Sequence, residues 1–363
     1  MARKCVSKYK HDFEHFFHEK MGYKILSDPA QYQYVESVLA PTQDVQAVFV
    51  DAKAGTGKAL RNGSKVQTPY GPVAIETLLP GMEVLGSDGK SHLVKGVFPQ
   101  GSKEIIKVHF TNGTIVECCE EHLWTYSING EEEKTTSLSA LMEEINLDEI
   151  GTITLPALPV VSYPSNDLVV SPELLGRLIN NNKLPDYSLV KLTKAILSSI
   201  EDEEDKKKAL KLIGNTVKTP RIPEEYLVNV VPVRLELLRS LVEVTQGSNS
   251  YTTPHLELAK DIQNLAHSLG LYTKIEEFPV VADNYVLYSL KFPPQLKEVL
   301  DEKRIKPLDM IEGLPRPTIK AIERTYEHDY MTCISVNSPD KLFLTEGYIP
   351  THNTTMAMAS AYY

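Results

Sequence analysis

The sequence predicts a mainly β domain that is split by an α+β insertion and flanked by short segments of a different, α/β fold. In residues 60–160, apolar and polar residues alternate over short stretches separated by Gly, Asn and Asp, which is typical of strands joined by turns. In residues 170–325 the apolar residues take helical spacing, and strand patterns return after about residue 326. The simplest account is one β domain in two halves with an insertion between them.

Individual segments carry these patterns. We expect strands at 65–68, 83–85, 105–110, 332–336 and 342–344, with turns at 87–89 and 112–113. We expect helices at 173–179 and 235–242. The charged run 201–208 predicts a solvated helix surface or loop, because mixed charges at this density rarely form a site.

Composition sets the class of protein. The 363 residues suggest two or three domains at about 150 residues each. The net charge of -10 gives no basic surface that would call for nucleic acid. No signal-peptide core and no run of about 18 apolar residues is present, so no membrane partner is expected. The four cysteines (Cys5, Cys118, Cys119 and Cys333) lack disulfide spacing, which predicts reduced thiols in a cytoplasmic compartment. We expect the chain to be a monomer.

A phosphate-binding loop begins near the N-terminus and then breaks off. The stretch VFVDAKAGTGK, residues 48–58, runs from an apolar strand into a loop with Gly55, Thr56, Gly57 and Lys58. Such a loop reads GxxxxGK followed by Ser or Thr, which binds magnesium. The next residue here is Ala59, and a turn-and-strand pattern follows instead of a helix.

The missing continuation stands at the other end of the chain. Residues 354–363 read TTMAMASAYY, which is the absent Thr354 followed by the start of a helix. Joining Lys58 to Thr354 gives AKAGTGKTTMAMASAYY and restores strand, loop and helix. Two distant ends that complete one motif indicate that the sequence between them is an insertion.

Three stretches between these ends resemble the Hint domain of inteins. They are TPYGPVAIETLLPGMEV (68–84), GTIVECCEEHLW (113–124) and CISVNSPDKLFLTEGYIPTHN (333–353). The resemblance divides the chain into an N-extein (1–58), a first Hint part (59–165), an insertion (166–325), a second Hint part (326–353) and a C-extein (354–363). It implies autocatalytic splicing, in which residues 59–353 leave and Lys58 is joined to Thr354.

The downstream junction, His352-Asn353-Thr354, has the chemistry for self-cleavage. The Asn353 side-chain amide can attack its own backbone carbonyl and form a succinimide. Because the reaction is intramolecular, orientation can lower its barrier by several kcal/mol, about 7–11 at best. His352 can supply a proton to the leaving amine or the carbonyl oxygen.

The upstream junction lacks the usual first nucleophile, because Ala59 stands where most inteins have Cys or Ser. The sequence instead resembles an intein class with a Trp, Cys and Thr signature, which falls on Trp124, Cys333 and Thr351. This resemblance implies that the Cys333 thiolate attacks the Lys58 carbonyl. Trp124 and Thr351 would then be packing and positioning residues.

Further roles follow from the same resemblance. His122 would polarise or protonate the Lys58-Ala59 amide, Thr354 would take the acyl group from Cys333, and Asn353 would cyclise. Cys119 replaces the usual Thr three residues before His122, and a thiol is the poorer hydrogen-bond donor. Cys119 is an alternative nucleophile that we rank below Cys333. No cofactor is required, and the chain acts on itself.

The insertion resembles a degenerate LAGLIDADG homing endonuclease. The two helical signatures lie at 174–182 and 234–243, and 256–270 resembles the helix that follows each half. Active members carry metal-binding Asp residues at positions that are Asn181 and near Thr245 here, so we expect no DNA cleavage. The helix-packing glycines are replaced by Asn180 and Ser240. The resemblance leaves room for weak DNA binding.

The flanks resemble a PhoH-like P-loop ATPase, whose loop commonly reads GPAGTGKT. After ligation, Gly55, Thr56, Gly57, Lys58 and Thr354 would bind ATP with magnesium, whereas the unspliced loop would not. Three alternatives remain open from the residues: a conventional intein that has lost its first nucleophile at Ala59, a DNA-cleaving homing enzyme, and an ATPase with an inert insertion.

Overall fold

The computed structural model describes residues 58–145, 151–180, 186–242, 249–280, 285–301 and 307–352. The first half of the phosphate-binding loop, Gly55 to Gly57, lies outside these residues, as do Asn353 and Thr354. The metal positions expected from the endonuclease resemblance, Asn181 and Thr245, also lie outside them.

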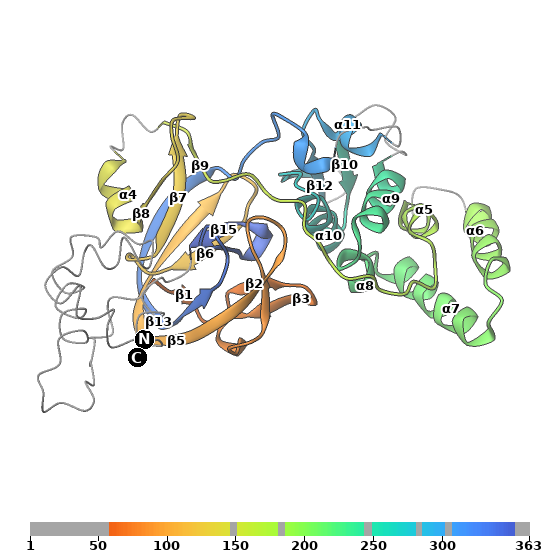
Figure 1. The fold of residues 1–363 in the computed structure, drawn as a ribbon. Coiled ribbons are helices and arrows are strands. Elements are labelled where there is room, and N and C mark those ends of the chain that lie inside the picture. Colours follow the sequence, from red (N-terminus) through yellow and green to blue (C-terminus); the bar gives the residue numbers. More distant parts are fainter. Residues whose placement is uncertain are drawn as a thin grey trace, which may run out of the picture. The chain divides into compact units, whose positions relative to one another are not determined.

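The central element of the β part is a five-stranded sheet with the order β13-β1-β6-β5-β4. Its strands are β1 (Leu60–Arg61), β4 (Glu83–Leu85), β5 (Ser91–Phe110), β6 (Ile115–Cys118) and β13 (Ile319–Val336). Strand β13 also pairs with β5 in an antiparallel register that runs from Ile319 opposite Phe110 to Val336 opposite Val94. The chain's last long strand is therefore paired along its length with one from the first half (Figure 1).

Smaller elements complete this part. One hairpin is formed by β2 (Lys65–Thr68) and β3 (Gly71–Ala74), and another by β14 (Leu342–Leu344) and β15 (Pro350–His352). A three-stranded sheet has the order β8 (Lys134–Ser137), β7 (Leu123–Ile128) and β9 (Ile153–Thr154). The helical pieces are η1 (Ile75–Thr77), α4 (Leu138–Glu144) and η5 (Glu346–Tyr348). The expected strands at 65–68, 83–85 and 342–344 are confirmed with the same bounds, and those at 105–110 and 332–336 are the ends of β5 and β13.

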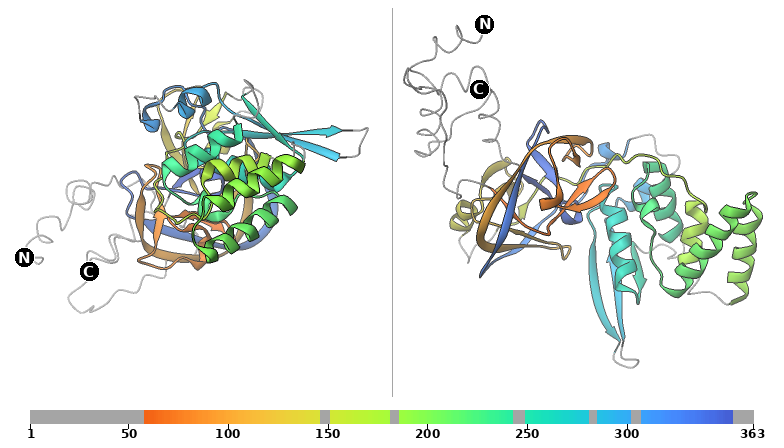
Figure 2. Two further views of the ribbon diagram at one scale, coloured as in Figure 1. Left: turned by 90° about the vertical axis from the view of Figure 1, so that its right-hand side faces the viewer. Right: turned by 90° about the horizontal axis from the view of Figure 1, so that it is seen from below.

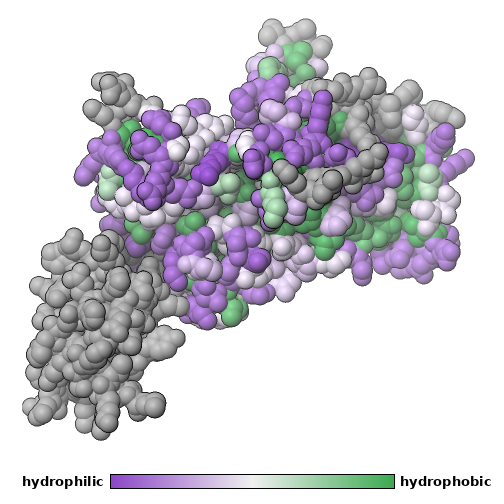
Figure 3. Space-filling view, turned by 45° about the horizontal axis from the view of Figure 1, so that its top comes forward, coloured by the Kyte–Doolittle hydropathy of each residue, from purple (hydrophilic) through white to green (hydrophobic). Residues whose placement is uncertain are grey.

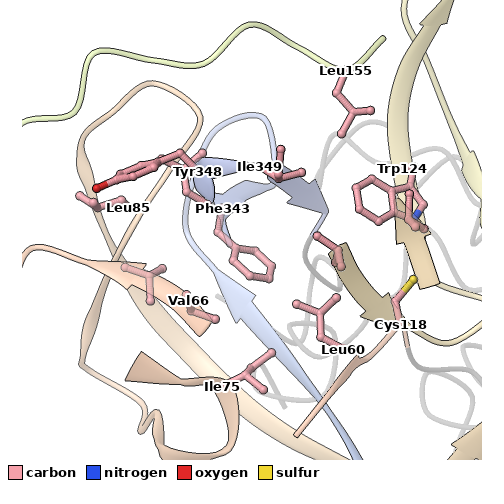
Figure 4. Packing of buried hydrophobic residues seen from close by; sticks show 14 of the residues in the cluster. Leu60, Val66, Ile75, Leu85, Cys118, Trp124, Leu155, Phe343, Tyr348 and Ile349 are labelled. Atoms are coloured by element: carbon pink, nitrogen blue, oxygen red, sulfur yellow. The ribbon is translucent and has the colours of Figure 1, made fainter. Parts of the chain in front are cut away.

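One hydrophobic core joins the two halves. Buried residues from the first half, such as Leu60, Val66 and Trp124, pack with Phe343 and Ile349 from the second (Figure 4). Burial of such side chains contributes about 1.5–3 kcal/mol each to the stability of the fold. Because the core contains residues of both halves, either half alone would expose its apolar face to water. Strand β13 begins at Ile319, ahead of the expected boundary at residue 326, and Ile319 and Ile322 pack against this core.

The inserted segment has its own core and is mixed helix and strand. Its elements are α5 (Pro172–Asn180), α6 (Asp186–Ser198), α7 (Glu203–Lys218), α8 (Glu224–Leu227), α9 (Val231–Val242), β10 (Ser250–Thr253), α10 (Leu256–His267), β11 (Lys274–Val280), β12 (Tyr285–Lys291), α11 (Leu296–Leu300) and η4 (Leu308–Met310). The strands form one sheet with the order β10-β12-β11, and the β11–β12 hairpin extends beyond the helices (Figure 2). The helices expected at 173–179 and 235–242 are confirmed as α5 and α9.

Helices α5 and α9 pack closely against each other. A Cβ atom on Gly176 would lie 2.6 Å from Ser240 Oγ, so only glycine fits at this approach. Asn180 Nδ2 donates hydrogen bonds to the carbonyl oxygens of Ser240 (3.2 Å) and Leu241 (3.0 Å). The polar side chains of Asn180 and Ser240 therefore bridge the two helices.

The charged run lies on the exposed side of α7. Asp202 caps the helix by accepting hydrogen bonds from the backbone N–H groups of Glu204 and Asp205, both at 2.9 Å. The ion pairs that follow are solvent-exposed, as expected for a solvated helix surface. On the face in Figure 3, hydrophobic residues form small patches among hydrophilic ones. None of the helices within the described ranges is long and apolar enough to cross a membrane.

Candidate active site

The upstream junction is held at the start of β1. Leu60 lies between Cys118 of β6 and Thr332 of β13 in the sheet. The preceding residue, Ala59, donates its N–H to Cys119 Sγ at 3.3 Å, and its carbonyl accepts the Cys119 N–H at 3.1 Å. The amide nitrogen of the Lys58-Ala59 bond is therefore fixed by the thiol that replaces the usual threonine.

A small apolar cluster surrounds Ala59, which is fully buried. Its other members are Ile105, Cys119, Met331 and Cys333, with Phe98 packed against them. Met331 and Cys333 are two residues apart on β13, so their side chains leave the strand on the same face. The predicted nucleophile thus shares an apolar cluster with the first residue after the bond it would attack.

Lys58 brings a positive charge to this cluster. Burial lowers the pKa of the Lys58 ammonium, and the charge of Cys333 acts in the opposite direction and raises that pKa. Because electrostatic attraction is mutual, the Lys58 ammonium stabilises negative charge on the Cys333 sulfur. Sequence reasoning assigned Lys58 only to the junction and to phosphate binding.

The two neighbouring thiols are poorly suited to attack. Burial raises the pKa of Cys119 to about 12 and that of Cys118 well above its usual range. At pH 7 the Cys119 side chain is therefore a thiol, whereas the thiolate is the reactive form. The structure therefore favours Cys119 as a hydrogen-bond acceptor for the junction.

His122 lies close to Lys58, Thr351 and His352. Its Nε2 is 2.5 Å from Thr351 Oγ1, and its Nδ1 is buried without a hydrogen-bond partner in the described part of the chain. Burial, together with the charges of His352 and Lys58, lowers the pKa of His122 to about 3. The imidazole is therefore neutral at pH 7, so in this state it can accept a proton or polarise a bond, but it holds no extra proton to donate.

Trp124 fixes one side of the His122 ring. The indole is fully buried and meets the imidazole edge-on, with 5.5 Å between the ring centres. Its other neighbours include Phe110, at 6.0 Å between ring centres, and the Cys118 sulfur points towards it (Figure 4). These contacts are those of a packing residue.

The downstream junction reaches the site through the β14–β15 hairpin. Thr351 lies opposite Phe343 and His352 opposite Leu342. Thr351 is fully buried, and its hydroxyl pairs with His122. His352 is half-buried and lies close enough for its charge to act on His122.

Most of the sequence-predicted residues therefore come together. The described ones that share this site are Lys58, Ala59, Cys119, His122, Trp124, Cys333, Thr351 and His352. Sequence reasoning did not identify Ile105, Met331 and Phe98, and only the period-two spacing of Met331 and Cys333 could have indicated one of them. Among the described residues, no three His, Cys, Asp or Glu side chains form a group that could hold a metal ion.

Comparisons with known proteins point to DnaB proteins and to inteins. No known family profile matches the sequence. The chain is 23% identical over 355 residues to the replicative DNA helicase DnaB of Mycobacterium intracellulare; the match covers 86% of this chain and 61% of the helicase. The chain thus spans about three fifths of that relative's length.

Three similar solved structures are inteins. The MchDnaB-1 intein is 13% identical, with 81% of this chain and 100% of that chain covered and a TM-score of 0.26. A variant of the Ssp DnaB mini-intein is 10% identical, with coverages of 81% and 92% and a TM-score of 0.30. The gp41-1 intein is 31% identical over 22% of this chain and 59% of that chain, with a TM-score of 0.20. Because these TM-scores are low, the proposal below rests on the geometry of the site.

Proposed function

We propose that the chain is an intein precursor in which residues 59–353 excise themselves and Lys58 is joined to Thr354. The observation that carries this proposal is that His122 lies close to residues near both ends of the segment, Lys58 and Thr351. The His122 ring is hydrogen-bonded to Thr351, and the charges of Lys58 and His352 both lower the pKa of His122. A cleavage at one end and a transfer to the other need such proximity.

In the first step, the Cys333 sulfur adds to the Lys58 carbonyl carbon. The carbon–nitrogen bond to Ala59 breaks, and a thioester between Lys58 and Cys333 forms. The thiol proton passes to the leaving Ala59 amine, and the neutral His122 can polarise the Lys58-Ala59 bond. The Lys58 ammonium stabilises the thiolate, and Cys119 holds the junction amide in place.

The remaining steps transfer and release the product. The Thr354 hydroxyl attacks the thioester carbonyl, which forms an ester and returns the thiol of Cys333. The Asn353 amide nitrogen then attacks its own backbone carbonyl, so the bond to Thr354 breaks and a succinimide forms. The freed Thr354 amine attacks the ester carbonyl and gives the Lys58-Thr354 peptide. No cofactor takes part.

Intact-mass measurement of freshly expressed protein tests this function. The wild-type chain should give an excised product and a ligated product, and Cys333→Ala should lose both upstream cleavage and ligation. Cys118→Ala is the matched control, because the Cys118 side chain belongs to the main core and not to the cluster that contains Ala59 and Cys333. Normal splicing by Cys333→Ala would show that the proposed route is wrong.

A conventional intein with a lost first nucleophile is the second candidate. Its support is the position of Ala59, whose buried side chain lies in the same cluster as Cys333. In that case the double variant Ala59→Cys/Cys333→Ala should splice. Failure of the double variant, together with splicing by the wild type, would exclude this candidate.

For the insertion we propose a degenerate LAGLIDADG domain with weak DNA binding and no cleavage. The close packing of α5 on α9 supports this origin, because these helices carry the two signatures. A magnesium-dependent plasmid-nicking assay tests it, and nicking that disappears with EDTA would contradict it.

For the flanks we propose a cytoplasmic PhoH-like ATPase as host, with ATP and magnesium bound only after ligation. Titration of ATP into the precursor and into the spliced, full-length host tests this proposal. Binding of equal strength to both would contradict it.

A further inference from the structure

The turn that carries the downstream junction has an unusual backbone. Turn η5 joins β14 to β15 and lies directly before Thr351 and His352. Gly347 and Tyr348 both have φ of 62°, in the left-handed region that bulky residues rarely adopt. Such a conformation persists only where the surroundings enforce it.

The surroundings of Tyr348 come from outside the hairpin. Its side chain is buried, and its hydroxyl lies 2.9 Å from the hydroxyl of Tyr163. The ring of Tyr163 in turn lies against Arg234 of α9, with the guanidinium carbon 5.0 Å from the ring centre. A helix of the insertion is thus connected to the turn by two side chains.

Arg234 is a fully buried cation without a carboxylate. Its guanidinium donates to the carbonyls of Asn229 (2.7 Å) and Ser268 (2.7 Å), to the Ser268 hydroxyl (2.7 Å) and to the carbonyl of Val161. In the described chain it has no ion-pair partner, and these oxygens together with the Tyr163 ring offset the cost of burying the charge. Arg234 therefore joins α9, the end of α10 and the strand-like segment at Val161 in one fixed geometry.

A second set of contacts links the insertion to the same turn through the β5–β6 connection, residues 111–114. Tyr272, which follows α10, lies 3.1 Å from Thr111 Oγ1 and accepts the Asn112 N–H at 3.1 Å. A Cβ atom on Gly347 would lie 2.5 Å from Thr114 Oγ1, so the β5–β6 connection packs closely against η5. The insertion is bonded to the connection that contacts the turn.

We infer that Arg234 is a positioning residue for the downstream junction. It acts through Tyr163 and Tyr348, which hold η5 in its left-handed conformation and so fix where Thr351 and His352 lie. The insertion then serves the splicing reaction itself, whatever its ability to cut DNA. This inference rests on the proposed splicing function.

The test separates the two chemical steps in the full-length chain. Upstream thioester formation is measured by release of residues 1–58 with dithiothreitol, and downstream release is measured by intact mass over time. Arg234→Met should slow downstream release about 10- to 100-fold relative to the upstream step, because small misplacements of reacting groups have effects of this size. Tyr348→Phe should slow it in the same direction.

Arg239→Met is the matched control. Arg239 lies on the same helix, and its side chain donates to the Leu300 carbonyl within the insertion. It should leave the ratio of the two rates unchanged, while Arg234→Lys should restore part of the downstream rate. Equal slowing of both steps in Arg234→Met and in Arg239→Met would overturn the inference.

If Arg234→Met does not fold, the ratio of the two rates in Tyr348→Phe tests the inference instead. This substitution removes one hydroxyl group and leaves the volume of the core almost unchanged. An unchanged ratio in Tyr348→Phe would then overturn the inference. Failure of the wild type to splice would instead contradict the proposed function, so the two failures are distinguishable.

Discussion

At the residue scale, the site combines one neutral base, one cation and one thiol that lies beside the cation. His122 is kept neutral by burial, whereas Lys58 interacts with Cys333 across the apolar cluster. Cys119, with its pKa raised to about 12, keeps its proton and accepts the Ala59 N–H. Three neighbouring groups thus have different protonation behaviour because their burial and charge partners differ.

The role of the Lys58 charge can be tested directly. Lys58→Met should slow upstream thioester formation about tenfold, because loss of about 1.4 kcal/mol of stabilisation changes a rate by a factor of ten. Lys58→Arg keeps the charge and should retain most of the rate. Both are measured by dithiothreitol-released fragment. Equal rates for Lys58→Met and the wild type would show that the cation does not assist Cys333.

At the element scale, the short strands could be predicted from sequence, whereas the long ones could not. The strands at 65–68 and 342–344 follow from their own apolar pattern. The middle of β5 is polar and mostly half-buried, and the middle of β13 is polar and largely exposed. These segments are strands only because they pair with each other. Such pairing between distant segments leaves no local signal.

The same limit applies to the site. Its reactive residues were predicted from motifs, because Cys333, His122 and Thr351 each stand in a recognisable stretch. The hydrogen bond from Ala59 to Cys119 depends on the register of β1 between β6 and β13. The contact of Arg234 with Tyr163 depends on how the insertion packs. Neither of these two contacts can be predicted from the sequence around the residues that make it.

An irregularity in β13 gives a stability prediction. The register shifts between Arg324 and His328, and Tyr326 within this shift has φ of 61° and is 78% exposed. Tyr326→Gly removes the left-handed penalty of about 1–2 kcal/mol. This gain exceeds the cost of the greater conformational entropy that glycine gives the unfolded chain. The free energy of unfolding measured in urea should therefore rise by about 0.5–1 kcal/mol.

Tyr330→Gly is the control for this prediction. Tyr330 is also an exposed tyrosine on β13, but it pairs in regular register with Ser102 and has no positive φ. Glycine in a regular strand should lower the free energy of unfolding. Equal effects of the two substitutions would contradict the proposed strain.

At the scale of the whole molecule, the β part and the insertion each bury a histidine. His122 lies in the active site, and His267 at the end of α10 stacks on Tyr272 with 5.6 Å between ring centres. Burial lowers the pKa of His122 to about 3 and that of His267 to about 4. In mildly acidic solution, each of these two histidines therefore stays unprotonated in the folded chain but would be protonated in the unfolded chain.

Stability should consequently fall on acidification. Between about pH 6.5 and pH 4 the unfolded chain protonates both histidines while the folded chain protonates neither, so each histidine lowers the free energy of unfolding by up to about 1.4 kcal/mol per pH unit. Urea unfolding of the Cys333→Ala chain at several pH values measures this slope. Because His267→Gln and His122→Gln each remove one of the two protons, either substitution should reduce the slope by about half. A slope that neither substitution changes would show that carboxylate groups, and not these two histidines, link stability to pH.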